Sequence, residues 1–233
     1  NINKKGINKI LCSLLTRGCE GFDNFVLSEY IESHGAELNQ EVFEDGISIS
    51  IKSLNEHFNK LRPILDLIIH EPILSEIEFK KVKKSSINFI KKDKENPFNI
   101  CFEKWRKIVY SRHPYAFSTI GDENNVSKIT YEDVLCEFRK FKCREKYLIS
   151  NNSEVNGENL GTLEKETLKE KSNPINHNLG SIDRFDYINN DSNQTIIMIG
   201  NQTCSRRSSE YLPLKVLESY LSYGMSAALF KLF

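Results

Sequence analysis

The spacing of the hydrophobic residues changes abruptly after residue 52. From 47 to 52, isoleucines alternate with polar residues, and this period of two predicts a half-buried strand with a hairpin partner in 37–43. From Leu54 to Ile68 the apolar residues fall instead on one face of a helix. Glu71-Pro72 ends the run, because the residue before a proline avoids the helical conformation. A hairpin followed directly by a helix predicts an α+β protein.

Six other segments have the apolar period of amphipathic helices. They are Ile7 to Arg17, Phe25 to His34, the run after Ser75, Pro97 to Val109, Tyr131 to Phe141, and Glu210 to Phe233 with a break at Gly224. Asn24, Ser75 and Thr130 are the expected N-caps of three of these helices. Continuous apolar runs at Tyr147 to Ile149 and Thr195 to Ile199 predict two further strands.

The segment from Asn151 to about Asp183 is polar and nearly free of large apolar residues. It buries too little surface to offset its ordering entropy, so we expect a linker or insertion at 151–183. Residues 1–150 are then expected to form a first α/β unit, and residues 184–233 the truncated start of a second. Because the first residue is not Met and the last helix ends uncapped, we expect both ends to continue in a longer protein.

Charge and hydropathy argue against several classes of partner. The chain carries 32 basic and 32 acidic residues, so no overall field attracts a nucleic acid. No run approaches the ~18 consecutive apolar residues of a membrane span, and Asn1 to Gly6 lacks the core of a signal peptide. The six cysteines show no C-x-x-C spacing, which indicates reduced thiols and favours the cytoplasm or an organelle matrix.

Several short blocks occur in an order and spacing that resemble a known family. The blocks are Leu14-Leu15-Thr16-Arg17-Gly18, Glu32-Ser33-His34-Gly35-Ala36-Glu37-Leu38-Asn39, His113-Pro114-Tyr115, Gly121 with Ile129-Thr130, Gln194 to Gly200, and Leu221-Ser222-Tyr223-Gly224-Met225-Ser226 with Leu229-Phe230. Together they span nearly the whole chain and resemble the insulinase/pitrilysin-like zinc peptidases, the inverzincins. The resemblance implies layered α/β units, each an antiparallel or mixed sheet with helices on one face. It also implies two such units facing each other across a closed chamber.

Active members of this family bind zinc through a His-x-x-Glu-His helix and a glutamate on a later helix. The two histidines share a helix face, and the glutamate between them activates the zinc-bound water. Counted back from Arg17, the positions of the first histidine, the glutamate and the second histidine hold Lys9, Cys12 and Ser13. The window for the later glutamate, Ser85 to Ile90, holds no carboxylate. The resemblance therefore implies no catalytic residue, metal ligand or cofactor in this segment, with zinc expected only in an active partner half.

Other chemistry finds little support in the residues present. The five histidines lie far apart, and no pair has the spacing of metal ligands. Cys12 lies on an apolar helix face with no visible base, which is typical of a buried core residue rather than a nucleophile. No P-loop, G-x-S-x-G or G-x-G-x-x-G motif occurs.

Three functional hypotheses follow from these observations. The first is a non-catalytic half or subunit that pairs with a homologous zinc-bearing half and helps to hold an extended peptide or unfolded protein segment. We expect the peptide at a sheet edge, either at Thr195, Ile197 and Ile199 or at the hairpin of 37–51. The second is the latter half of an active zinc metallopeptidase whose motif lies upstream of Asn1. The third is a non-enzymatic scaffold that kept the fold.

Overall fold

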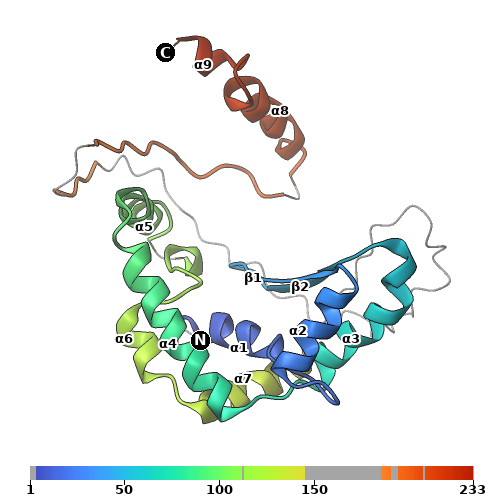
Figure 1. The fold of residues 1–233 in the computed structure, drawn as a ribbon. Helices are drawn as coiled ribbons and strands as arrows, with labels where there is room; N and C mark the ends of the chain where they lie inside the picture. Colours follow the sequence, from blue (N-terminus) through green and yellow to red (C-terminus); the bar gives the residue numbers. More distant parts are fainter. Residues whose placement is uncertain (1–3, 112, 145–184, 190–193, 207, 233) are drawn as a thin grey trace. The chain divides into compact units, whose positions relative to one another are not determined.

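The computed structural model describes residues 4–111, 113–144, 185–189, 194–206 and 208–232 (Figure 1). The chain divides into two compact units, Asn1–Ile197 and Met198–Phe233. The linker expected at 151–183 and the strand expected at Tyr147 to Ile149 lie outside the described residues.

Helix α1, Ile7–Leu15, is the centre of the larger unit. Its buried residues are Ile7, Ile10, Leu11, Cys12, Leu14 and Leu15. A helix that is apolar over most of its circumference has to be covered on several sides. Helices α4 (Glu76–Asp93) and α7 (Tyr131–Lys142) and the hairpin all contact it. Figure 1 shows the hairpin on one side of α1 and α7 on the other.

Strands β1, Glu37–Val42, and β2, Ile47–Lys52, form a two-stranded antiparallel sheet in which Val42 pairs with Ile47 beside the turn. Exposed and half-buried residues alternate along both strands, and α1 packs against the sheet. The predicted hairpin is confirmed. The α+β class, with an antiparallel sheet and packed helices, is confirmed with it.

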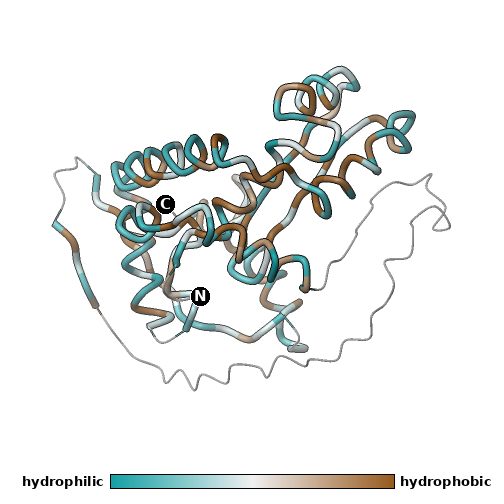
Figure 2. Tube along the Cα trace, turned by 90° about the horizontal axis from the view of Figure 1, so that it is seen from below, coloured by the Kyte–Doolittle hydropathy of each residue, from teal (hydrophilic) through white to brown (hydrophobic). Residues whose placement is uncertain are grey.

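The remaining elements of the larger unit surround this core. They are α2 (Asn24–Ser33), the 3-10 helix η1 (Asn55–His57), α3 (Phe58–His70), α5 (Pro97–Val109), the 3-10 helix η2 (Pro114–Ala116) and α6 (Glu123–Lys128). Hydrophobic and hydrophilic positions alternate along the helices, as amphipathic packing requires (Figure 2).

The helix caps follow the sequence closely, with one difference. Ser75 caps α4, and Thr130 caps α7 within a capping box, as predicted. The cap expected at Asn24 is wrong by one residue, because the Asp23 carboxylate accepts two N–H groups of the first turn of α2. Asn24 is therefore the first residue of that helix.

Two side chains from distant elements hold the turn between the strands. Arg106 of α5 is buried, lies 3.2 Å from the Glu44 carboxylate and donates to the carbonyl of Phe117. The Tyr115 hydroxyl donates to both carboxylate oxygens of Asp45 at 2.6 and 2.7 Å. The tip of the hairpin thus contacts both α5 and η2.

The smaller unit contains α8, Tyr211–Ser222, and α9, Ala228–Leu232. The predicted break at Gly224 separates the two helices. Among the described residues of this unit, Ala227 alone is a buried hydrophobic residue. No helix in the described part of the chain is both long and apolar enough to cross a membrane.

The strand predicted at Thr195 to Ile199 is wrong. Residues 194–200 are described, and none of them belongs to a strand. An apolar run becomes a strand only beside a segment that completes its hydrogen-bond ladder. The sheet within the described ranges pairs β1 with β2 and leaves this run without such a neighbour.

Candidate functional site

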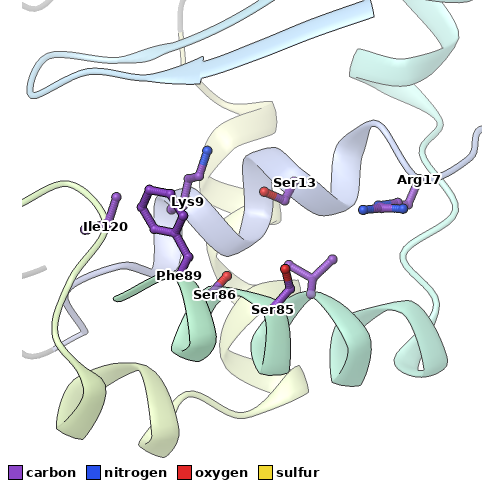
Figure 3. Close-up of a pocket in the computed structure, with 8 residues that line it drawn as sticks. Lys9, Ser13, Arg17, Ser85, Ser86, Phe89 and Ile120 are labelled. Carbon is purple, nitrogen blue, oxygen red and sulfur yellow. The ribbon is translucent and has the colours of Figure 1, made fainter. Parts of the chain in front are cut away.

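A pocket of about 230 Å³ lies between α1 and α4 in the larger unit (Figure 3). Its lining residues are Lys9, Ser13, Arg17, Val82, Ser85, Ser86, Phe89 and Ile120. Lys9 and Ser13 are four residues apart and lie on one face of α1, and Arg17 lies in the turn that follows the helix. Four of the others come from α4, which runs beside α1. Packing of the two helices thus creates the pocket.

This pocket lies where the family resemblance places the zinc site. Lys9 and Ser13 occupy the two histidine positions of the motif, and Ser85 and Ser86 belong to the window of the later glutamate. Figure 3 shows the hydroxyls of Ser85 and Ser86 on the side of α4 that faces α1. The fold therefore brings the degenerate motif positions together across a large distance in the sequence.

The lining residues do not fit a zinc ion. Zinc is held in proteins by thiolates, imidazoles and carboxylates, whereas this pocket offers hydroxyls, an ammonium group and a guanidinium group. The two cations also repel a divalent metal. Within the described ranges, no group of three His, Cys, Asp or Glu residues is placed to hold a metal ion.

Cys12, at the position of the water-activating glutamate, is not among the lining residues. Its side chain is 0% exposed, and its Sγ lies 3.7 Å from the carbonyl oxygen of Glu41 on β1. Burial raises the pKa of the Cys12 thiol to about 11, and the charge of Lys9 lowers it by a smaller amount. A protonated, enclosed thiol is a packing group rather than a nucleophile.

The tertiary structure joins two histidines that are far apart in the sequence. The rings of His34, at the end of α2, and His57, in η1, meet edge to face with centroids 5.0 Å apart. His34 Nδ1 also lies 2.7 Å from the carbonyl oxygen of Tyr30, and His113 Nδ1 accepts the N–H of Tyr115 at 3.2 Å. No local spacing signals the contact between His34 and His57, so sequence reasoning missed it.

The residues expected to form a peptide-binding edge expose their side chains. Ile197 is 77% exposed and Ile199 is 93% exposed, and Thr195 is exposed as well. This segment lies outside the lining of the pocket. Peptide binding by this segment stays a prediction, and the exposed apolar side chains are the observation that bears on it.

Arg17 is the lining residue that sequence reasoning overlooked as a functional group. In the sequence, Arg17 was used only as the reference residue from which the positions of the motif were counted. The four-residue spacing of Lys9, Ser13 and Arg17 was a partial signal, although the structure ends the helix at Leu15 and places Arg17 in the following turn. Reading that spacing past the motif would have found it.

The fold and the pocket can be compared with what the family resemblance implies. A hairpin covers the motif helix, a later helix lies beside it, and the ligand positions meet in a pocket that lacks zinc ligands. This arrangement agrees with the insulinase/pitrilysin-like resemblance, except that the metal-ligand side chains are missing from the expected positions.

The comparison with curated proteins found a similar zinc protease. Over 99% of its length the chain is 24% identical, across 239 aligned residues, to an uncharacterized zinc protease of Rickettsia felis. The chain spans 57% of the length of that protein. No protein-family model matches the chain.

Three solved structures share the fold. One is a peptidase M16 inactive domain from Pseudomonas fluorescens. The match covers 57% of this chain and 33% of that domain's chain, with a TM-score of 0.52 and 23% identity. A protease from Helicobacter pylori matches 58% and 33%, with a TM-score of 0.54 and 18% identity. A conserved protein from Enterococcus faecalis matches 60% and 38%, with a TM-score of 0.54 and 16% identity. The α+β fold that the resemblance implies is confirmed, and the chain is similar to a zinc protease and to an inactive domain of a peptidase.

Proposed function

We propose that this chain is the non-catalytic half or subunit of a zinc metallopeptidase and helps to enclose a peptide substrate. The observation that carries the proposal is the pocket of Lys9, Ser13, Ser85 and Ser86. Its geometry unites the positions that hold the metal in active members, while its chemistry excludes the metal. The chain then contributes walls and binding surface, and zinc belongs to a partner half.

An extended peptide is the ligand that this fold is suited to hold. Each strand of the hairpin β1–β2 has a side without a partner strand among the described residues. The segment Thr195 to Ile199 exposes apolar side chains. A peptide that adds to such an edge gains main-chain hydrogen bonds, and its alternate side chains reach pockets of the protein.

The zinc-bearing half belongs either to a separate subunit or to the same polypeptide. The zinc protease of Rickettsia felis is longer than the region matched by this chain, which supports the covalent arrangement as an alternative. The six cysteines are free thiols, and we place the protein in a reducing compartment such as the cytoplasm or an organelle matrix.

The test measures bound zinc and cleavage of an unstructured, quenched fluorescent peptide. The full-length protein is assayed alone and after mixing with homologous subunits that carry His-x-x-Glu-His, with the 233-residue segment in parallel. A partner whose motif glutamate is replaced by Gln controls for contaminating proteases. Activity only in the mixture supports a separate partner, and zinc with activity in the full-length protein alone supports a covalent one.

Absence of zinc, cleavage and peptide binding in every mixture would contradict the proposal and favour a structural scaffold. Peptide binding is therefore measured separately by fluorescence anisotropy. A non-catalytic half is expected to bind unstructured peptides even where it cannot cut them.

A further inference from the structure

The pocket between α1 and α4 is positively charged and lacks a compensating carboxylate. Lys9 and Arg17 both line it, and none of its lining residues is acidic. Within the described part of the chain, neither cation forms an ion pair. Lys80 and Lys81 on the neighbouring α4, by contrast, pair with Glu76 and Glu78. The two lining cations are therefore available to an anionic ligand.

Three hydroxyl groups add neutral hydrogen-bond donors to these charges. Ser13 Oγ accepts a long hydrogen bond of 3.5 Å from Gln40, which leaves its own O–H to donate. Ser219 on α8 shows the usual alternative for a helical serine, because it donates to the carbonyl four residues earlier. No such bond engages Ser85 or Ser86 in the described structure, and Figure 3 shows both hydroxyls facing α1.

The positions of Lys9 on α1 and of Arg17 just beyond its end specify the spacing of the ligand's charges. Figure 3 shows Lys9 and Arg17 at opposite ends of the row, with Ser13 between them. Lys9 lies on α1, which ends at Leu15, and Arg17 lies in the turn directly after it, so at the helical rise the two residues are about 12 Å apart along the chain. An extended chain rises about 3.3 Å per residue and repeats its side-chain direction every second residue. Two side chains four positions apart on an extended peptide therefore match the separation of the two cations.

We propose that this pocket binds an extended acidic peptide, with one carboxylate on Lys9 and a second, four positions away, on Arg17. Ser13, Ser85 and Ser86 donate hydrogen bonds to main-chain carbonyls of the peptide between these ends. The inference rests on the proposed peptide-binding function and names its substrate class. Charge-assisted hydrogen bonds of this kind are stronger than neutral ones, so the degenerate motif positions select peptides by charge.

The experiment measures binding of labelled peptides to the full-length protein by fluorescence anisotropy at several salt concentrations. One peptide carries two glutamates four positions apart, a second carries Gln at both positions, and a third has its two glutamates adjacent. Lys9→Met and Arg17→Met, singly and together, remove the charge and keep the aliphatic stem. Lys92→Met is the matched control, because Lys92 is an exposed lysine of α4 outside the pocket lining.

We expect the spaced glutamate peptide to bind about tenfold tighter than the Gln peptide at low salt, as two partly exposed ion pairs allow. The double variant should lose this preference, and the Lys92 variant should keep it. The peptide with adjacent glutamates should bind the wild type more weakly than the peptide with spaced glutamates. Equal binding of the Glu and Gln peptides would overturn the acidic-peptide inference and leave the proposed function standing. Binding of no peptide would overturn both, and full displacement by an equal concentration of inorganic phosphate would make the pocket a free-anion site.

Discussion

The Tyr115 hydroxyl donates to both carboxylate oxygens of Asp45, at 2.6 and 2.7 Å, and so ties η2 to the tip of the hairpin. The buried side chain of Arg106 makes a second tie to the same turn through Glu44. These contacts hold the two-stranded sheet at its turn. The sheet in turn packs against α1.

Tyr115→Phe should lower the free energy of unfolding by about 1 kcal/mol, because it removes a hydrogen bond to a charged acceptor at a partly exposed position. Urea denaturation followed by circular dichroism measures the change. Tyr220→Phe is the control, since Tyr220 is 69% exposed. Equal stability of the two variants would show that the tie to Asp45 contributes nothing.

Gly121 faces Gly6 where the backbone before α6 meets the backbone before α1. A Cβ on Gly121 would lie 2.6 Å from the carbonyl oxygen of Lys5 and 2.9 Å from the Cα of Gly6, at a φ of +79°. Gly121→Ala should therefore destabilise the protein by about 2 kcal/mol more than Gly35→Ala. Gly35 also has positive φ but open space around it, so it isolates the steric contribution. Thermal and urea unfolding measure the stability of the two variants. An equal loss of stability in both would rule out the steric clash at Gly121.

Cys12 should make stability fall as the pH rises above 9. Burial raises the pKa of its thiol from 9.0 to about 11. The folded state thus keeps a proton that the unfolded state releases, so this contribution is complete below pH 9 and is lost as the pH rises through 11. A shift of this size corresponds to about 2–3 kcal/mol.

The measurement is the free energy of unfolding at pH 8.5 to 10.5, in the wild type and in Cys12→Ala. We expect a shallower decline in the variant. Alkylation at pH 8 gives a second readout, with Cys136 and Cys143 modified first because both are exposed. Rapid alkylation of Cys12 in the folded protein would contradict its assignment as an enclosed, protonated thiol.

The pocket should accept zinc once ligands are restored. Lys9→His and Ser13→His place two imidazoles one helical turn apart, and Ser86→Glu adds a carboxylate from α4. We expect zinc binding in about the micromolar range or tighter for this triple variant, measured by competition with a chromogenic chelator. Cleavage should stay absent because Cys12 still replaces the general base.

The control for the rebuilt site carries Asn88→Glu in place of Ser86→Glu. Asn88 lies on the same helix and is exposed, but it does not line the pocket. Zinc should bind this control more weakly. Equal affinity in the two triple variants would show that α4 does not supply the later ligand position.

Local patterns were sufficient wherever neighbours along the chain decide the conformation. The period of two in 47–52, the caps at Ser75 and Thr130 and the break at Gly224 depend on a few adjacent residues, and all were predicted. The apolar run at 195–199 shows where this reasoning fails. A strand needs hydrogen bonds from another segment, and composition alone does not say whether that segment is present.

The sequence by itself determined the α+β elements through local spacing, and the family resemblance implied zinc-ligand positions at Lys9, Ser13 and the window from Ser85, where no ligand side chain stands. Only the tertiary structure decided that these positions meet in one pocket and that the Cys12 thiol is enclosed. It also decided that Arg17 adds a second positive charge to the lining of this pocket. The physical reason is packing. Burial of the apolar circumference of α1 draws α4, α7 and the hairpin onto it, and contacts between distant segments follow from that burial rather than from any pattern along the chain.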